Sequence, residues 1–191
     1  MPPTEFRLKL IEAAAQECSD LVGTSRGDPR LRQRIRSYYE KLSLPVPTNV
    51  DKAHYSAVFI SWCMRKAGAT AEEFPTTEAH SEYVCRAIEA EPGAPFRAHR
   101  IEDYAPAPGD IVHFNRDGRR ITFERAQEGH YKSESGIVLE MGRNSEGRHA
   151  TLTVGNDPAG TVARHQIGLT ESGLIRQREV DPIICVIEVA K

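Results

Sequence analysis

The segment from His54 to Gly68 contains a dense run of apolar side chains, and its pattern predicts a helix. The apolar residues occupy most faces of this helix, at Val58, Ile60, Trp62, Cys63, Met64 and Ala67. A helix that is apolar on most sides lies inside a domain, so we expect this one to be central to the fold. Ser56 stands at a favoured N-cap position, and Arg65 and Lys66 before the glycine are typical of a helix C-terminus.

Three further segments have apolar residues spaced by three or four, which predicts amphipathic helices. The first, residues 4–21, begins with Thr4 as a candidate N-cap. The second, residues 28–42, begins with Asp28 followed by a proline, which fits the first helical position. The third is expected over residues 77–90, where prolines and a glycine follow and end the helix.

The pattern changes after residue 105 to short apolar runs that are separated by turns, as in β-strands. The expected strands are residues 110–114, 121–123, 136–141, 150–154, 161–167 and 183–189. Short connections between them predict an antiparallel sheet. Helices followed by strands predict an α+β fold, with a single domain over residues 1–191 that has a helical part, 1–105, and a sheet part, 106–191.

The composition excludes several classes of protein. The net charge of -2 gives no basic excess that would indicate a nucleic-acid-binding protein, and no apolar run approaches the length of a membrane span. The N-terminal residues lack the pattern of a Sec-type signal, so we expect synthesis in the cytoplasm and, for a wall substrate, delivery to a periplasm by a non-Sec route.

No cofactor or metal site is expected from the sequence. The four cysteines lie in apolar segments without metal-binding spacing, which predicts buried free thiols at Cys18, Cys63, Cys85 and Cys185. Glu134 and Asp157 with a nearby histidine could in principle hold a cation. The chain lacks the spacing of a helical His-Glu-x-x-His site, however, so this alternative is the weaker one.

The start of the central helix resembles that of a known enzyme superfamily. Residues 55–62, Tyr-Ser-Ala-Val-Phe-Ile-Ser-Trp, are similar to the core helix of the papain-like NlpC-type and CHAP peptidoglycan peptidases and amidases. The chain resembles more closely an uncharacterised bacterial branch with serine at the nucleophile position. That resemblance extends to Phe74, His80, Tyr83, Phe96-Arg97-Ala98 and the segment 103–110. It implies a papain-like fold with N-terminal helices packed on an antiparallel sheet.

The resemblance also implies where a catalytic site would lie. Ser56 stands where the superfamily has its cysteine, and Glu134 stands where it has its histidine. Asn156 or Asp157 would be the polar residue that orients the base. A serine hydroxyl is far less acidic than a thiol and needs a strong base beside it, whereas a solvated glutamate is a weak base unless burial raises its pKa.

Three hypotheses follow from these replacements. In the first, the cleft is non-catalytic and binds a peptide, a murein fragment or a protein partner. In the second, Ser56 is the nucleophile of an active hydrolase and uses His54, His113 or His130 as its base. In the third, Cys63 is the nucleophile, although it would be buried two turns along the same helix face, where a thiol is inert. The sequence does not decide between the first two.

We therefore expect a domain related to cell-wall peptidases and amidases, with a cleft centred on Ser56, Glu134 and Asn156 and with His130 as the candidate base. Its reaction would be hydrolysis of a peptide or amide bond in peptidoglycan. The alternative is a non-catalytic peptide-, murein- or protein-binding module of an interbacterial or phage system. His80 is expected to be a core or supporting histidine rather than a catalytic one.

Overall fold

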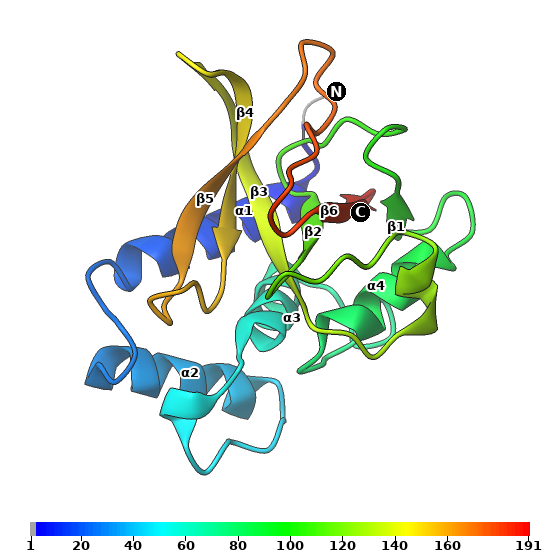
Figure 1. The fold of residues 1–191 in the computed structure, drawn as a ribbon. Helices are drawn as coiled ribbons and strands as arrows, with labels where there is room; N and C mark the ends of the chain where they lie inside the picture. The colour runs from blue at the N-terminus through cyan, green and yellow to red at the C-terminus, as the bar shows by residue number, and fades with distance from the viewer. Residues whose placement is uncertain (1–2) are drawn as a thin grey trace.

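A computed structural model describes residues 3–191 and shows an α+β architecture for them, as the sequence predicts (Figure 1). The helices are α1 (Glu5–Asp20), α2 (Pro29–Lys41), α3 (Ser56–Ala67) and α4 (His80–Ile88), with short 3-10 helices η1 (Val50–Lys52) and η2 (Arg125–Glu128). The strands are β1 (Phe96–His99), β2 (Ile111–Asn115), β3 (Ser133–Asn144), β4 (Gly147–Val154), β5 (Ala163–Gly168) and β6 (Ile183–Val189). In the described range none of the helices is both long and apolar enough to cross a bilayer.

The predicted helix ends are largely confirmed. The side chain of Thr4 accepts a hydrogen bond from the amide of Arg7, and that of Asp28 accepts one from the amide of Arg30. Both side chains therefore cap orphan amides at a helix start. Gly68 ends α3 in the left-handed conformation, with a φ of 107°, which a residue with a Cβ rarely adopts.

Two helix starts differ from the prediction by a few residues. Ser56 is the first residue of α3 rather than its cap, and Tyr55 occupies the cap position without a side-chain hydrogen bond. The hydroxyl of Ser56 therefore does not cap the helix and is available for other partners. The fourth helix begins at His80 instead of residue 77, because the Thr77 side chain accepts a bond from the Ala79 amide in a short turn.

The six strands of the described chain form one sheet in the order β1-β6-β2-β3-β4-β5, and every pairing in it is antiparallel, as predicted. The division into a helical and a sheet part at residue 105 is blurred, because β1 comes from the first part and pairs with β6 at the sheet edge. Residues 121–123 do not form the expected strand. The Asn115 side chain instead binds the amide and carbonyl of Ile121, which removes both groups from strand pairing.

The central strands are buried on both faces. On one face Ile111 and Ile137 belong to the large core that includes α1, α3 and α4. On the other face their neighbours Val112 and Val138 belong to a smaller core that the loop around Ile175 covers. Alternate residues of a strand point to opposite faces, so the same strands contribute to both cores.

The third helix is the central one, as its composition predicts. It packs on α1, α2 and β3, and Trp62 is only 4% exposed. Gly155, just after β4, allows this packing, because a Cβ there would lie 2.9 Å from Cβ of Phe59. Free thiols are confirmed at all four cysteines, of which Cys85 is half-buried and the other three are buried.

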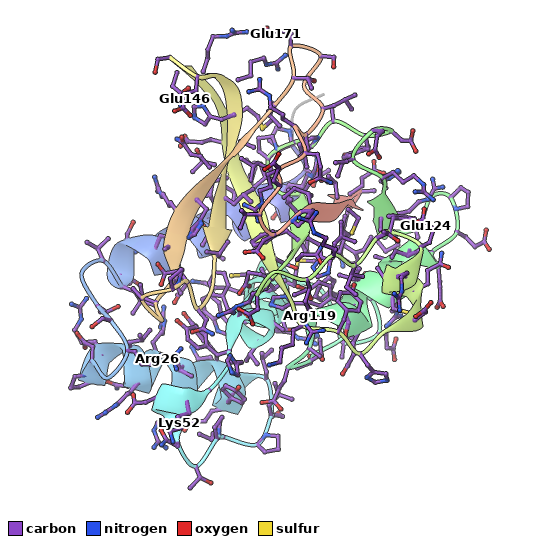
Figure 2. The ribbon with its side chains drawn as sticks, in the orientation of Figure 1. Arg26, Lys52, Arg119, Glu124, Glu146 and Glu171 are labelled. Atoms are coloured by element: carbon purple, nitrogen blue, oxygen red, sulfur yellow. The ribbon has the colours of Figure 1, made fainter. Side chains whose placement is uncertain are left out.

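The charged residues labelled in Figure 2 lie at the periphery of this fold. Glu146 at the tip of the β3–β4 hairpin and Glu171 in the loop after β5 lie at the same end of the molecule in Figure 2. An ion pair between Arg143 and Glu171, with Nη2 and Oε2 2.7 Å apart, ties that hairpin to the loop. This end of the molecule is the opposite one from α2 in Figure 1.

Candidate active site

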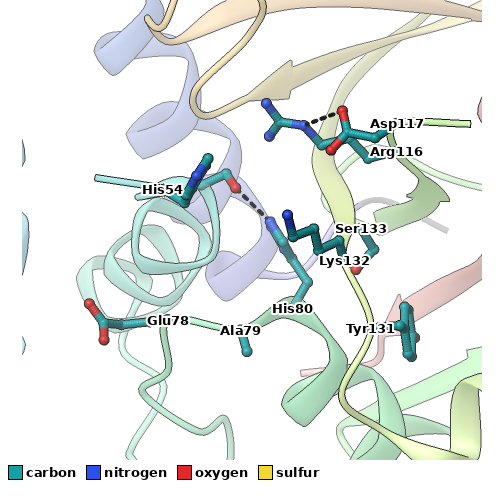
Figure 3. A pocket seen from close by; sticks show the side chains of 10 residues that line it. His54, Glu78, Ala79, His80, Arg116, Asp117, Tyr131, Lys132 and Ser133 are labelled. Carbon is teal, nitrogen blue, oxygen red and sulfur yellow. Dashed lines mark hydrogen bonds and ion pairs between the residues drawn. The ribbon is translucent and has the colours of Figure 1, made fainter. Parts of the chain in front are cut away.

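Two helix starts meet at the side chains of Ser56 and His80. Ser56 is the first residue of α3 and His80 the first of α4, and the Oγ atom of Ser56 lies 2.7 Å from Nε2 of His80. The dashed line at His80 in Figure 3 marks this hydrogen bond. Both residues are at least nine-tenths buried, so the pair is largely shielded from bulk water.

The loop between the two helices fixes this approach. The Ser61 hydroxyl on α3 accepts a hydrogen bond from the amide of Thr77 and donates one to the carbonyl of Pro75. The segment just before α4 is thereby attached to α3 one turn and a half beyond Ser56. The position of His80 against Ser56 therefore follows from backbone contacts as well as from the side chains.

Glu134 on β3 lies against the same histidine. Its Oε1 atom is 3.1 Å from Nε2 of His80, and its Oε2 atom is 3.1 Å from Nη1 of Arg116, which follows β2. The pairing of β2 with β3 places Phe114 opposite Glu134 and so brings Arg116 within reach. A buried carboxylate is costly unless it is paired, and here the guanidinium of Arg116 compensates its charge.

The other ring nitrogen of His80 has a partner on its own helix. Nδ1 of His80 is hydrogen-bonded to the hydroxyl of Tyr83, three residues along α4. Burial raises the pKa of Tyr83 well above its usual value, which keeps the hydroxyl neutral at physiological pH. This bond fixes the plane of the imidazole, because residues three apart lie on the same face of a helix.

A second buried histidine lies behind this group. Nδ1 of His113 is 2.8 Å from Oγ of Ser135, and its Nε2 is 3.1 Å from the hydroxyl of Tyr131. Burial lowers the pKa of His113 well below its usual value, and repulsion from the neighbouring imidazole of His80, when that is protonated, lowers it further. His113 is therefore a neutral imidazole that carries a single proton.

A pocket of about 200 Å³ opens at Ser56 and His80 and includes Tyr131 and Ser133 in its wall (Figure 3). A second pocket, of about 410 Å³, is lined by Glu134 and Asn156. Arg116 and Asp117 line both pockets, and their side chains form an ion pair with Nε and Oδ1 3.8 Å apart. The two pockets therefore adjoin each other at this ion pair.

The structure brings some of the expected site residues together and separates others. Ser56 and Glu134 meet, because both contact Nε2 of His80. Asn156 lines the second pocket, where its Oδ1 accepts a hydrogen bond from Nη2 of Arg26, 2.9 Å away. His130 is exposed and has a left-handed φ of 57°.

None of the three histidines expected as a base for Ser56 is the one that binds it. His54 lines the first pocket, His113 binds Ser135 and Tyr131, and His130 faces solvent. Cys63 is fully buried, and burial raises the pKa of its thiol well above the usual value, so this thiol is unreactive.

The residue that the sequence reasoning missed is His80, which was expected to support the core. Two signals in the sequence could have identified it. The segment with Phe74, His80 and Tyr83 is one of those on which the family resemblance rests. The spacing of three between the histidine and the tyrosine also places a hydroxyl beside the imidazole on one helix face.

The group has the parts of a nucleophile and a base. A hydroxyl at a helix start, hydrogen-bonded to an imidazole that a third group orients, is the arrangement of nucleophilic catalysis. The amides in the first turn of α3 are directed to the same place and could stabilise an oxyanion. Among residues 3–191, no group of three His, Cys, Asp or Glu side chains is arranged to hold a metal ion.

Comparison with known proteins gives one match. A family model with the description "Uncharacterized protein conserved in bacteria (DUF2272)" matches residues 22–184. No curated protein and no solved structure matches the chain. The matched range includes Ser56, His80 and Glu134, and so the whole group around the first pocket.

Proposed function

We propose that this chain, which belongs to the DUF2272 family of uncharacterized proteins conserved in bacteria, is a hydrolase of peptide or amide bonds. Ser56 is the nucleophile and His80 is its base. The observation that carries the proposal is the distance of 2.7 Å between Ser56 Oγ and His80 Nε2 at the start of α3, beside a pocket of about 200 Å³. Ser–His pairs of this geometry activate a hydroxyl for attack on a carbonyl carbon.

The reaction has two steps. Nε2 of His80 takes the proton of Ser56 as Oγ attacks the carbonyl carbon, and the amides at the start of α3 stabilise the oxyanion. The imidazolium then donates its proton to the leaving amine, and the C–N bond breaks. Water, activated by the same imidazole, hydrolyses the ester on Ser56 and restores the hydroxyl.

Glu134 and Tyr83 support His80 in this mechanism. The Tyr83 hydroxyl fixes the orientation of the ring through Nδ1. The carboxylate of Glu134, 3.1 Å from Nε2, stabilises the imidazolium that forms during attack. Arg116 balances the charge of Glu134 and keeps its carboxylate in place.

The substrate class and the papain-like assignment rest on the resemblance together with the fold. A nucleophile at the start of a central helix that packs on an antiparallel sheet is the layout of papain-like NlpC-type and CHAP domains. Peptide or amide bonds of peptidoglycan are therefore the proposed target. His80 on α4 then takes the role that a strand histidine has in those domains, and Glu134 occupies the strand position.

A second candidate function, a non-catalytic binding module for peptides or murein, is favoured by the same Glu134 contact. When Nε2 of His80 carries a proton that it donates to Oε1 of Glu134, it cannot accept the proton of Ser56. The pocket would then bind a ligand without attacking it. The two candidates differ in whether soluble fragments are released.

The deciding experiment is incubation of the purified protein with murein sacculi and mass spectrometry of the soluble fraction. Variants Ser56→Ala and His80→Gln are compared with Ser19→Ala, which removes a serine hydroxyl that bonds only to the Ala15 carbonyl on α1, away from the pocket. The hydrolase releases peptide-containing fragments, and the release is lost in the first two variants and kept in the third.

Absence of fragments from the native protein, with sacculi still bound to it, would support the binding module instead. In that case Ser56→Ala should leave binding to sacculi nearly unchanged. Fragments that persist in Ser56→Ala would reject Ser56 as the nucleophile.

A further inference from the structure

Two helices begin at the wall of the first pocket, the one of about 200 Å³, and their first residues, Ser56 and His80, both line it. Tyr55 precedes α3 and Ala79 precedes α4, and in the described chain neither side chain accepts a hydrogen bond from the turn that follows. The first amides of a helix carry partial positive charge and attract anions. Two uncapped helix starts at one pocket therefore favour a negatively charged ligand.

The wall of the same pocket contains a buried hydroxyl that is without a partner among residues 3–191. Ser133 is 7% exposed, and its Oγ atom makes no hydrogen bond in that range. In the view of Figure 3 this side chain lies between those of His80 and Tyr131. A buried polar group that lacks a partner is costly, and nearly all such groups in proteins are hydrogen-bonded. A ligand in the pocket would supply the missing partner.

The residue before Ser133 supplies a positive charge to the pocket. Lys132 lines the same wall, and its side chain extends toward His80 in the view of Figure 3. None of the ion pairs in the described part of the chain involves Lys132. An ammonium group has three donors, and a hydroxyl has one. Side by side, they match the two oxygens of a carboxylate.

The acidic side chains near the pocket do not use these donors. Asp117, in the pocket wall, is paired with Arg116, with Oδ1 and Nε 3.8 Å apart. Glu134 binds the same guanidinium, with Oε2 and Nη1 3.1 Å apart. Glu78 also lines the pocket, but in Figure 3 its carboxylate points away from the other labelled side chains. The free donors therefore lie together at the start of β3, apart from the carboxylates.

We infer that the first pocket binds a carboxylate of its ligand through Lys132 and Ser133, which are specificity-determining residues. This inference deepens the proposed function and rests on it: the substrate of Ser56 carries a free carboxylate close to the bond that is cleaved. The amides of α3 remain available to the oxyanion of the scissile carbonyl, because the carboxylate is held where β3 begins. Such a carboxylate belongs either to an acidic side chain or to the end of a peptide.

The first test uses acetate as the probe and acetamide as its uncharged counterpart. Each is titrated into the ¹⁵N-labelled full-length protein at constant pH and ionic strength, and ¹H–¹⁵N spectra record the backbone amides of Ser133 and His80. We expect acetate to give saturable shifts at both residues in the millimolar range and acetamide to give none. No saturable shift with acetate, or equal shifts with the two probes, would overturn the inference.

Variants then connect the binding of acetate to the two side chains. Lys132→Met and Ser133→Ala should each weaken it by about tenfold, the effect of losing one hydrogen bond to a charged group. Lys132 is exposed, so Lys132→Met should fold normally. The controls are Lys52→Met, at an exposed lysine of η1 (Figure 2), and Ser19→Ala, and both should bind acetate as the native protein does. Unchanged affinity in Lys132→Met and Ser133→Ala, or equal losses in the controls, would reject the site.

A second test identifies the source of the carboxylate. Murein stem peptides are bound to Ser56→Ala, which should not cleave them, in three forms: unmodified, with the C-terminal carboxylate converted to an amide, and with the internal carboxylates converted to amides. We expect at least one conversion to weaken binding by about tenfold, and Lys132→Met in the same background to remove that difference. If neither conversion weakens binding, the pocket does not hold a carboxylate of the substrate.

The outcome is separable from that of the murein experiment, because neither binding measurement needs catalysis. Selective binding of acetate together with no released fragments would remove the hydrolase function and leave the carboxylate site in place. Released fragments together with acetate binding that does not depend on Lys132 or Ser133 would keep the hydrolase and reject the carboxylate site.

Discussion

The Oε1 atom of Glu134 lies 3.1 Å from the Nε2 atom of His80, and both side chains are at least nine-tenths buried. A strand from the second half of the chain thereby presents a carboxylate to the first residue of a helix from the first half. The same nitrogen is hydrogen-bonded to the hydroxyl of Ser56. Whether it donates or accepts a proton decides between the two functions considered above.

The first prediction concerns the charge of Glu134. Glu134→Gln removes the negative charge between Arg116 and His80 and leaves Arg116 without its buried partner. We expect the free energy of unfolding to fall by about 2 kcal/mol, the size of a hydrogen bond to a charged group. Urea denaturation at neutral pH measures it.

The matched control for that variant is Glu140→Gln, on the same strand with an exposed side chain. Its free energy of unfolding should stay within about 0.5 kcal/mol of the native value. Equal losses in the two variants would mean that the contacts of Glu134 contribute nothing specific to stability.

The second prediction concerns the activating environment at position 56. In Ser56→Cys a thiol stands at a helix start beside an imidazole, two features that lower a thiol pKa. We expect this thiol to react with iodoacetamide at neutral pH before any native cysteine does. Burial raises the pKa of Cys85, the half-buried native thiol, and those of the three buried ones as well.

Peptide mass spectrometry of the alkylated protein locates the modified thiol. The control is the double variant Ser56→Cys with His80→Gln, in which alkylation at position 56 should become slower. If alkylation is equally fast in the single and the double variant, His80 does not act on position 56.

Local patterns predicted most of the fold. The apolar residues on most faces of 54–68 indicated a buried central helix. The continuous apolar runs around Ile137 and Ile187 indicated inner strands, because a strand that is buried on both faces is apolar at nearly every position. The expected strand over 121–123 failed for a non-local reason. The side chain of Asn115 binds the backbone of Ile121, and the apolar pattern of residues 121–123 by itself does not indicate this contact.

The site was predicted only in part, for a related reason. Ser56 could be named from its place at the start of the central helix, and the family resemblance implied Glu134 at the strand position where the superfamily has its histidine. His80 was undervalued, since an imidazole on an apolar helix face is usually a core residue, and its role depends on how the loop before α4 is held against α3. Asn156 was expected to orient the base, but its side chain binds Arg26, which comes from a turn far away in the sequence.

The third prediction concerns the core around the central helix. Trp62 is 4% exposed, and the cationic groups of Arg34 and Lys66 lie 5.4 and 4.8 Å from its ring centroid. Trp62→Ala should lower the free energy of unfolding by about 3–5 kcal/mol, through lost burial and the cavity that remains. The control Val22→Ala, at a side chain that is 71% exposed, should change it by less than about 0.5 kcal/mol. Comparable losses in both variants would contradict a central role for α3.

The last prediction concerns the pH dependence of stability that His113 imposes. Its pKa in the folded protein lies well below the usual value because of burial, whereas in the unfolded chain it should be about 6.5. Between these two pKa values the unfolded state binds the extra proton, so stability falls as the pH falls. The contribution is fully present above about pH 6.5 and is lost at up to about 1.4 kcal/mol per pH unit below it.

Carboxylates also change stability in this range, so the measurement is the difference between the native protein and His113→Phe. Phenylalanine keeps a ring but cannot bind a proton, and we expect the stability advantage of the native protein to shrink from about pH 6 to about pH 5. The exposed His130 is the control, since His130→Gln should give a difference from the native protein that stays constant with pH. A constant difference for His113→Phe as well would mean that His113 takes up its proton as readily in the folded state as in the unfolded chain.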